Sequence, residues 1–264
     1  MSTIDSSIPS TKTDGLAPLD VEAVLAAPPP SPDFVLPGLS RGSVGAIVGP
    51  GGTGKTMLAL QIAVSLALGI PVAGGLFPAP KAPMKVSLVT GEEGANQLTI
   101  RLHAIVDQLL APHLPLCRGV ERARIAAQLR QQLRLYPCVG KDIVLLRRGT
   151  RTAALGRVHR AITESDIVLI ETVSRLHDGD ENATSSVAAL LSAVEWLAQT
   201  ANAGIVLLHH TSKFADLNGL GGSQHAARGS SAFVDNIRWM ANLFNMSQDE
   251  AAKLGVEAAR KHIL

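Results

Sequence analysis

The chain has 264 residues, of which 46% are hydrophobic and 17% are charged, so it can bury a sizeable core and its composition argues against global disorder. Its formal net charge of +2 gives no argument for nucleic-acid binding from composition alone. Because aromatic residues make up only 3% of the chain, any binding of single-stranded nucleic acid would depend more on phosphate contacts than on base stacking.

The start of the chain is predicted to be a flexible segment, residues 1–27, with a short helix at 19–27 that the following prolines would end. Residues 28–264 are expected to form one domain, as the length favours. No secretory signal is visible, because the polar start lacks a basic region followed by an apolar core. The apolar stretch at 57–75 contains polar residues and a proline and directly follows a phosphate-loop motif, so it predicts a buried helix rather than a membrane span. We therefore expect a cytoplasmic protein without membrane contact.

Apolar strands and helices alternate along the rest of the chain. Short apolar runs predict strands at 43–48, 85–89, 135–139, 143–146, 166–171 and 205–209. Helices are predicted at about 55–68, 96–110, 120–134, 152–163 and 184–201. Because apolar strands that alternate with helices are typical of parallel sheets covered on both faces, we predict a doubly wound α/β fold.

Residues 49–56, GPGGTGKT, match the phosphate-loop pattern G-x-x-x-x-G-K-[ST] in full, and they lie between a predicted strand and a predicted helix. Glycines there let backbone N–H groups turn towards phosphate oxygens at the start of the helix. Lys55 would reach the β and γ phosphates of ATP, and the Thr56 hydroxyl would hold Mg²⁺. The predicted nucleotide site comprises Gly49, Pro50, Gly51, Gly52, Thr53, Gly54, Lys55, Thr56 and Met57.

Acidic residues end two of the predicted strands. Glu171 closes the apolar run at 166–171, where a carboxylate that coordinates Mg²⁺ is expected in a P-loop protein, although a solvent-facing strand end is the alternative. Glu92 and Glu93 follow the strand at 85–89. One of them, preferably Glu92, could activate the water that attacks the γ phosphate. The alternative is that this pair stabilises the start of the next helix through its dipole.

Residues 205–231 place two histidines, His209 and His210, at the end of a strand and before a glycine-rich segment. A metal site lacks a third ligand at suitable spacing, and a serine hydrolase lacks its GxSxG motif. A polar residue at this strand end can instead respond to the γ phosphate, unless it is an ordinary core histidine. Residues 211–228 predict a pore loop that contacts nucleic acid or a flexible surface loop. Arg228 is either an arginine finger or an ordinary salt-bridging residue.

Five stretches of the chain together resemble a known family. Residues 28–66, 88–105, 168–177, 205–213 and 227–239 are similar to the RepA-type replicative helicases of broad-host-range IncQ plasmids. The resemblance covers roughly 25–264 and is weakest over 111–165. It implies a RecA-like P-loop NTPase fold, a twisted and mostly parallel sheet flanked by helices on both faces. It also implies a ring of six subunits with ATP at the subunit interfaces and single-stranded DNA in the channel.

Carried over to matching positions, the resemblance assigns a role to each candidate residue. It implies that Lys55 and Thr56 bind phosphate and Mg²⁺ and that Glu92 is the hydrolytic base. It makes His210 the sensor of the γ phosphate and Arg228 a finger that acts on a neighbouring subunit. The implied function is an ATP-hydrolysing DNA helicase for plasmid replication, with single-stranded DNA, copies of itself and other plasmid replication proteins as partners.

The chain departs from the family pattern in two places. Glu171 stands where the family has Asp, which would alter the metal step. The family continues past the position of Leu264, so we expect the ATPase domain to lack its last C-terminal strands. Two other functions therefore stay open. One is a RecA-like regulatory or recombination ATPase that remodels DNA complexes without unwinding them, and the other is an ATP-binding partner protein without turnover.

Overall fold

A computed structural model describes residues 17–72, 75–111, 120–180, 183–210, 231–244, 252, 253 and 255. The chain divides into two compact units, Met1–Pro32 and Asp33–Leu264. The elements, in chain order, are α1 (Val21–Ala26), β1 (Phe34–Leu36), β2 (Leu39–Ser40), β3 (Val44–Gly49), α2 (Lys55–Leu68), β4 (Val86–Thr90), α3 (Ala95–Leu109), α4 (Arg122–Gln132), β5 (Leu133–Pro137), β6 (Leu146–Arg147), β7 (Thr150–Arg151), α5 (Ala153–Ile162), β8 (Ile167–Glu171), η3 (Val173–Arg175), α6 (Thr184–Ala201), β9 (Gly204–His210), α8 (Ser231–Asn236) and β10 (Trp239–Asn242).

The first unit contains the short helix α1. Its N-cap is Asp20, whose side chain accepts a hydrogen bond from the Ala23 N–H at 3.1 Å, and Glu22 in the first turn favours the helix dipole. None of the residues of α1 is buried. Across the described part of the whole chain, no helix is both long enough and apolar enough to cross a membrane.

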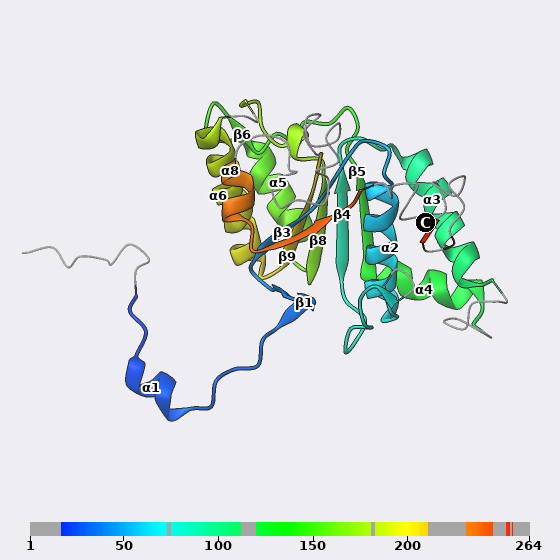
Figure 1. Cartoon of the computed structure of the whole chain (residues 1–264), viewed down its shortest axis with the longest axis horizontal. Coiled ribbons are helices and arrows are strands. Elements are labelled where there is room, and N and C mark those ends of the chain that lie inside the picture. Colours follow the sequence, from blue (N-terminus) through cyan, green and yellow to red (C-terminus); the bar gives the residue numbers. More distant parts are fainter. Residues whose placement is uncertain are drawn as a thin grey trace, which may run out of the picture. The chain divides into compact units, whose positions relative to one another are not determined.

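The second unit is built on a six-stranded sheet with the order β10-β3-β9-β8-β4-β5 (Figure 1). Each neighbouring pair in this sheet is parallel. Every residue of β3, β4 and β8 is buried, as the continuous apolar runs predicted for strands that are covered on both faces. The predicted doubly wound α/β architecture is therefore confirmed.

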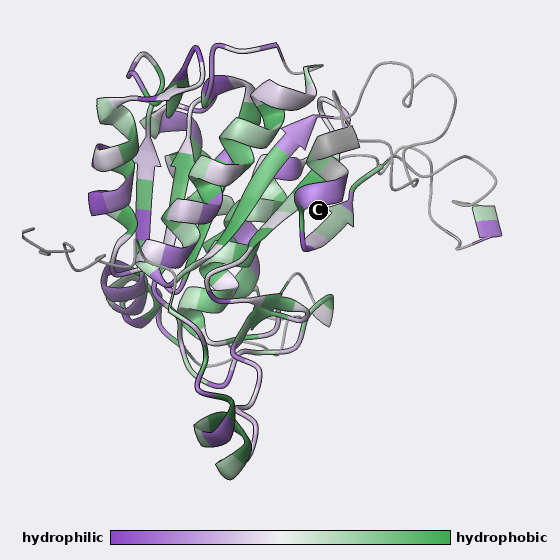
Figure 2. Cartoon of the chain, turned by 90° about the vertical axis from the view of Figure 1, so that its left-hand side faces the viewer, coloured by the Kyte–Doolittle hydropathy of each residue, from purple (hydrophilic) through white to green (hydrophobic). Residues whose placement is uncertain are grey.

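Helices cover both faces of the sheet, and each layer has its own apolar cluster. Helices α2, α3 and α4 pack on one face, and α5, α6 and α8 pack on the other. Successive residues of a strand point to opposite faces, so Ala46 and Val48 of β3 join the second cluster whereas Ile47 joins the first. Figure 2 shows the strands as mostly hydrophobic behind front helices that carry both hydrophilic and hydrophobic residues.

The predicted strand at 143–146 is wrong in extent, because only Leu146 belongs to a strand. That strand, β6, pairs antiparallel with β7 in a two-stranded hairpin outside the main sheet. Its turn is made by Arg148 and Gly149, both with positive φ, which is typical of a tight hairpin turn. Strands β1, β2 and β10 were not predicted either. They are only two to four residues long, too short to give a periodic signal.

Close packing at Gly204, the first residue of β9, gives a stability prediction. A Cβ atom at this position would lie 2.4 Å from Cγ2 of the buried Val35. We expect Gly204→Ala to lower the free energy of unfolding by about 1–3 kcal/mol through overpacking. Gly156 in α5 is the matched control, since its nearest contact would be Arg160 Nη1 at 3.7 Å.

Gly156→Ala should raise the free energy of unfolding by about 0.5–1 kcal/mol, because alanine is the better helix former. Urea denaturation of the two variants and the wild type measures both effects. Equal urea midpoints for the two variants would contradict the packing described at the start of β9.

Candidate functional site

The register of the parallel sheet gathers the predicted site residues at one edge. Gly49, the last residue of β3, pairs with His210 at the end of β9. On the other side, Thr90 at the end of β4 pairs with Glu171 at the end of β8. Because the carboxyl ends of parallel strands meet at one edge, residues far apart in the sequence lie side by side there.

The phosphate loop connects β3 to α2 at this edge. Gly54, the N-cap of α2, has φ +88°, a conformation that side chains other than glycine's disfavour. A Cβ atom on Gly49 would lie 2.3 Å from the carbonyl oxygen of Leu243, so only glycine fits there. The Thr53 hydroxyl donates to the Pro50 carbonyl at 2.8 Å and fixes the turn. The loop thus delivers the chain to the first turn of α2, whose free N–H groups and positive dipole end suit an anion.

Lys55 is buried at the start of α2, with 7% of its surface exposed. Its Nζ donates to the carbonyl oxygens of Gly49 at 2.8 Å and Pro50 at 2.6 Å, and it lies 3.3 Å from Nδ1 of His210. An ammonium group is costly to bury unless polar groups replace its water, and these contacts do so. The ammonium is therefore held inside the loop that a phosphate group would enter.

His210 lies between Lys55 and Glu92. Because the Lys55 ammonium can only donate, the neutral His210 ring must accept at Nδ1 and carry its proton on Nε2. That nitrogen lies 3.7 Å from Oε1 of Glu92. One chain of polar contacts therefore runs from the phosphate loop through His210 to the turn that follows β4.

Glu171 is almost fully buried beside the phosphate loop, with 2% of its surface exposed. The Thr56 hydroxyl donates to one of its carboxylate oxygens, and the Thr90 hydroxyl donates to the other at 2.8 Å. Burial raises the pKa of Glu171 above its usual range, and the nearby Glu92 and Glu93 carboxylates add to this, against the two hydroxyl groups that lower it. The adjoining oxygens of Thr56 and Glu171 are hard ligands of the kind that Mg²⁺ prefers, so the residues present fit this ion.

Thr90 organises the acidic turn and was missed by the sequence analysis. Its hydroxyl oxygen accepts hydrogen bonds from the N–H groups of Glu92 at 3.3 Å and Glu93 at 3.1 Å while it donates to Glu171. The signal that could have found it is a polar residue at the end of an apolar strand, next to the strand that ends in Glu171. Thr90 therefore connects the turn to the predicted metal ligand.

The two adjacent glutamates of this turn have different surroundings. Arg101 of α3 binds Glu93 through two hydrogen bonds, from Nε at 2.9 Å and from Nη2 at 2.5 Å. Such a bidentate pair fixes a carboxylate in place. Glu92 approaches Nε2 of His210 instead.

The two histidines also differ. His209 is 2% exposed, and its ring lies 4.4 Å from the ring of Phe233 in α8, so it is part of the packed core. His210 is the one that faces the phosphate loop. Residues 211–230 lie outside the described residues, so the predictions of a pore loop and of a finger at Arg228 stay predictions.

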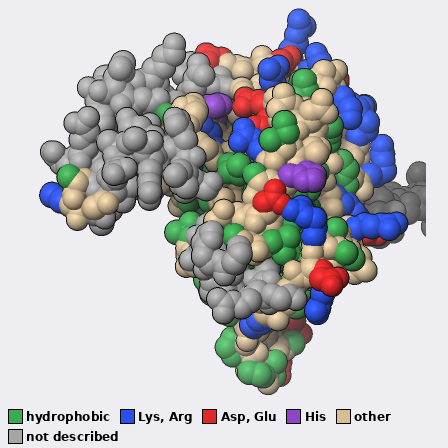
Figure 3. All heavy atoms as spheres, turned by 90° about the vertical axis from the view of Figure 1, so that its right-hand side faces the viewer, with side chains coloured by type: hydrophobic (Ala, Val, Ile, Leu, Met, Phe, Trp, Pro, Cys, Tyr) green, Lys and Arg blue, Asp and Glu red, His purple; other side chains and the backbone are tan. Residues whose placement is uncertain are grey.

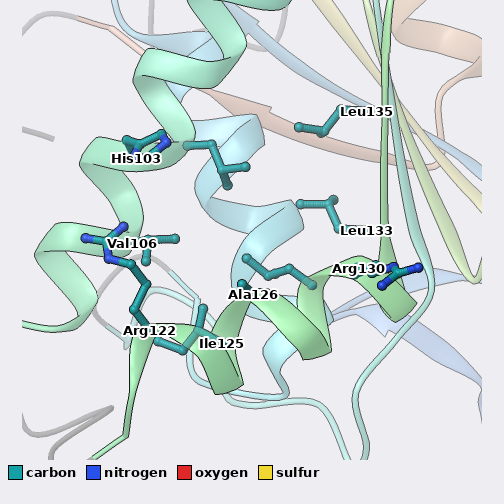
Figure 4. Close-up of a pocket in the computed structure, with 10 residues that line it drawn as sticks. His103, Val106, Arg122, Ile125, Ala126, Arg130, Leu133 and Leu135 are labelled. Carbon is teal, nitrogen blue, oxygen red and sulfur yellow. The ribbon is translucent and has the colours of Figure 1, made fainter.

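Two further features bear on the predicted nucleotide site. The Met57 side chain packs against the apolar cluster under α2, so any contact with a nucleotide would come from its backbone. A cavity of about 360 Å³ opens between α3, α4 and β5 and is lined mainly by apolar side chains, including Val106, Ile125 and Leu129 (Figure 4). None of its lining residues belongs to the phosphate loop.

A phosphate loop that ends in a buried lysine, with a hydroxyl–carboxylate pair beside it on a parallel sheet, defines a P-loop ATPase domain with a RecA-like fold. The fold is similar to that of a solved helicase ATPase domain, with a TM-score of 0.51 and 13% identity over 81% of this chain and 72% of that chain. A RadB recombinase structure aligns with a TM-score of 0.39 and 16% identity over 66% of this chain and 63% of that chain, so the alignment spans less than two thirds of the recombinase.

A family model described as an AAA domain matches residues 11–216. The chain therefore belongs to this AAA-domain family of ATPases. Nucleotide binding is the property that this family and the phosphate loop share, and it agrees with the ATP site predicted from the sequence.

The raised pKa of Glu171 predicts a pH-dependent change in stability. Because the folded state favours the protonated carboxyl group, stability is lost as the pH rises from the usual glutamate range, about 4.3, through the raised pKa. Glu171→Gln removes this loss. Without Mg²⁺, we expect the variant to gain thermal stability over the wild type as the pH rises towards 7.

Glu164 is the matched control, because a hydrogen bond from Arg134 lowers its pKa. Its ionised form favours the folded state, so Glu164→Gln should show no gain at neutral pH, and any change should be a small loss. Thermal unfolding in EDTA across this pH range measures both variants. A Glu171→Gln difference that does not change with pH would contradict the burial effect.

Proposed function

We propose that this chain is an ATP-hydrolysing DNA helicase that works as a ring of six subunits in plasmid replication. ATP cycling in the ring would move pore loops and so pull single-stranded DNA. The RepA-type resemblance supports this proposal, because its motifs include the histidine strand end as well as the phosphate loop. The observation that carries it is the line of contacts from Lys55 through His210 to Glu92.

This line of contacts suggests how a γ phosphate is sensed. A phosphate bound in the loop offers Lys55 a charged partner that is stronger than two carbonyl groups and a neutral ring. Lys55 would then turn towards the phosphate and release Nδ1 of His210. Since His210 is the last residue of β9, a change in its contacts would pass directly into the segment that follows.

Glu92 is the proposed hydrolytic base. Its neighbour Glu93 is held by Arg101, whereas Glu92 lies beside His210 at the edge where the γ phosphate would lie. A base must come within hydrogen-bond reach of the attacking water, and this arrangement leaves Glu92 the better placed of the two.

Thr56 and Glu171 are proposed to hold Mg²⁺ with the phosphates. The ion would bridge phosphate oxygens and neutralise the charge that develops on them. Thr56 and Thr90 keep the Glu171 carboxylate oriented before the ion binds. The extra methylene of glutamate, compared with the aspartate of the family pattern, brings the carboxylate into contact with the Thr56 hydroxyl.

Arg228 is proposed to complete the site of a neighbouring subunit. If it acts in trans, Arg228→Ala should abolish turnover, and mixing that variant with a Lys55→Ala protein should restore part of it. In the mixed ring an intact loop can meet an intact arginine. ATP turnover of the mixture measures this, and no recovery in rings known to exchange subunits would contradict a trans role.

The assignment of Glu92 leads to a direct comparison. We expect Glu92→Gln to lower kcat by about 10²–10⁴-fold with ATP binding retained, because it removes the base but keeps the side-chain shape. Glu93→Gln should keep kcat within a few-fold, since the amide oxygen can still accept a hydrogen bond from Arg101. Steady-state turnover and binding of a fluorescent ATP analogue measure the two effects. A larger loss in Glu93→Gln would reverse the assignment.

Turnover and strand separation with and without single-stranded DNA test the function as a whole. DNA-stimulated turnover with strand separation is the expected result. Stimulated turnover without separation would favour a regulatory or recombination ATPase, and ATP binding without turnover would favour a non-enzymatic partner protein. Lys55→Ala should abolish turnover in any ATPase, so a variant that still turns over would refute the site itself.

A further inference from the structure

Positive charge is concentrated in one stretch of the chain. Residues 141–160 contain six Lys and Arg residues and a single acidic residue, whereas the whole chain has a net charge of only +2. The rest of the chain is therefore net negative. The six residues are Lys141, Arg147, Arg148, Arg151, Arg157 and Arg160, and all of them are exposed.

The hairpin β6–β7 presents part of this charge at its tip. In its register, Leu146 faces Arg151 and Arg147 faces Thr150. Leu146 is buried, so the next residue, Arg147, points away from the core. Arg148 forms the turn with φ 49°. Two guanidinium groups therefore extend from the end of the hairpin.

Few negative groups compensate this charge. Arg147 is 3.2 Å from Asp142, but both side chains are more than half exposed, so the pair is weak. Arg151 lies over the ring of Trp196, 4.9 Å from its centre. Within the described part of the chain, Arg148 makes no ion pair through its guanidinium group. Its backbone N–H donates to Asp178 at 2.8 Å.

A polar hollow of about 290 Å³ adjoins the hairpin. Arg148 lines it together with His177, Asp178 and the hydroxyl-bearing residues Ser185 and Ser186. Asp178 introduces one negative charge there, but the backbone N–H of Arg148 already occupies its Oδ1. Hydroxyl groups beside a guanidinium suit a phosphate oxygen.

The hairpin is attached to the segment that leaves the proposed metal ligand. The N–H groups of Leu145 and Leu146 both donate to the carbonyl oxygen of Leu176, at 2.6 Å and 3.3 Å. Leu176 follows η3 and lies five positions after Glu171. These residues are buried, so the base of the hairpin is fixed to the carboxyl end of β8.

We propose that the β6–β7 hairpin binds the phosphate backbone of single-stranded DNA, with Arg147 and Arg148 as the contacting residues. This inference rests on the proposed function and adds a DNA contact outside the histidine-led loop. A row of exposed cations fits a chain with few aromatic residues, because such a chain must hold DNA mainly through phosphates. The attachment to the Glu171 segment favours DNA over an acidic protein, since the substrate of the motor must lie close to its ATP site.

The opposite face of the sheet offers a control surface. Over α3 and α4, Lys and Arg side chains are interspersed with Asp and Glu and with hydrophobic side chains (Figure 3). Arg122 there pairs with Asp107. Arg124 and Arg130 of α4 are exposed and lie on the face away from α5, so they match the hairpin arginines in charge but not in position.

The test compares binding of a labelled oligo(dT) strand by fluorescence anisotropy at several salt concentrations, with Mg²⁺ and a non-hydrolysable ATP analogue present. For Arg147→Gln/Arg148→Gln, losing two phosphate contacts should lower the slope of log affinity against log salt by about 1.4 and weaken binding about 25-fold near 0.1 M salt. Arg147→Lys/Arg148→Lys should bind nearly as the wild type does, because lysine also contacts phosphate as a cation.

Arg124→Gln/Arg130→Gln should keep the affinity and slope of the wild type. DNA-independent ATP turnover should be unchanged in all three variants, which shows that they are folded. If the hairpin and control variants bind alike, by both keeping or both losing affinity, the hairpin assignment is wrong while the helicase proposal stands. If the wild type binds no DNA and a poly-glutamate probe binds the hairpin instead, an acidic protein is the partner and both proposals fall.

Discussion

A buried lysine sets the terms for the whole site. Placing the Lys55 ammonium at the base of the phosphate loop removes it from water, which is tolerable only where several acceptors replace the lost solvent. The carbonyl oxygens of Gly49 and Pro50 and the ring of His210 do this here. These acceptors lie where they do because β3 and β9 are neighbours that end level with each other. The sheet order is therefore a requirement of the chemistry.

The same requirement explains the second half of the site. Glu171 is as deeply buried as Lys55, and the hydroxyl groups of Thr56 and Thr90 satisfy its two oxygens. Thr90 also holds the turn that carries Glu92, so the predicted base and the predicted metal ligand share one threonine. Two buried groups of opposite charge at the edge of one sheet make a site that is arranged before any ligand binds. Preorganisation of this kind is what an ATPase needs.

Much of this arrangement could be predicted from the sequence, because its signals are local. A complete phosphate loop and three continuous apolar strands, β4, β8 and β9, are hard to read in another way, and they predicted Lys55, Glu171 and His210 together. Thr90 escaped because its role depends on the pairing of β4 with β8, which no single stretch encodes. The β6–β7 hairpin escaped because two-residue strands have no periodicity and depend on a turn with positive φ. The choice between His209 and His210 needed the packing of Phe233.

The central claim is that Lys55 exchanges its contact with His210 for the phosphate of a nucleotide. A crystal structure of the chain with Mg²⁺ and a non-hydrolysable ATP analogue tests it most directly. The account predicts Lys55 Nζ on the β and γ phosphate oxygens and away from Nδ1 of His210, with Thr56 and Glu171 at the ion. An analogue bound elsewhere, with Lys55 still on the Gly49 and Pro50 carbonyl groups, would contradict it.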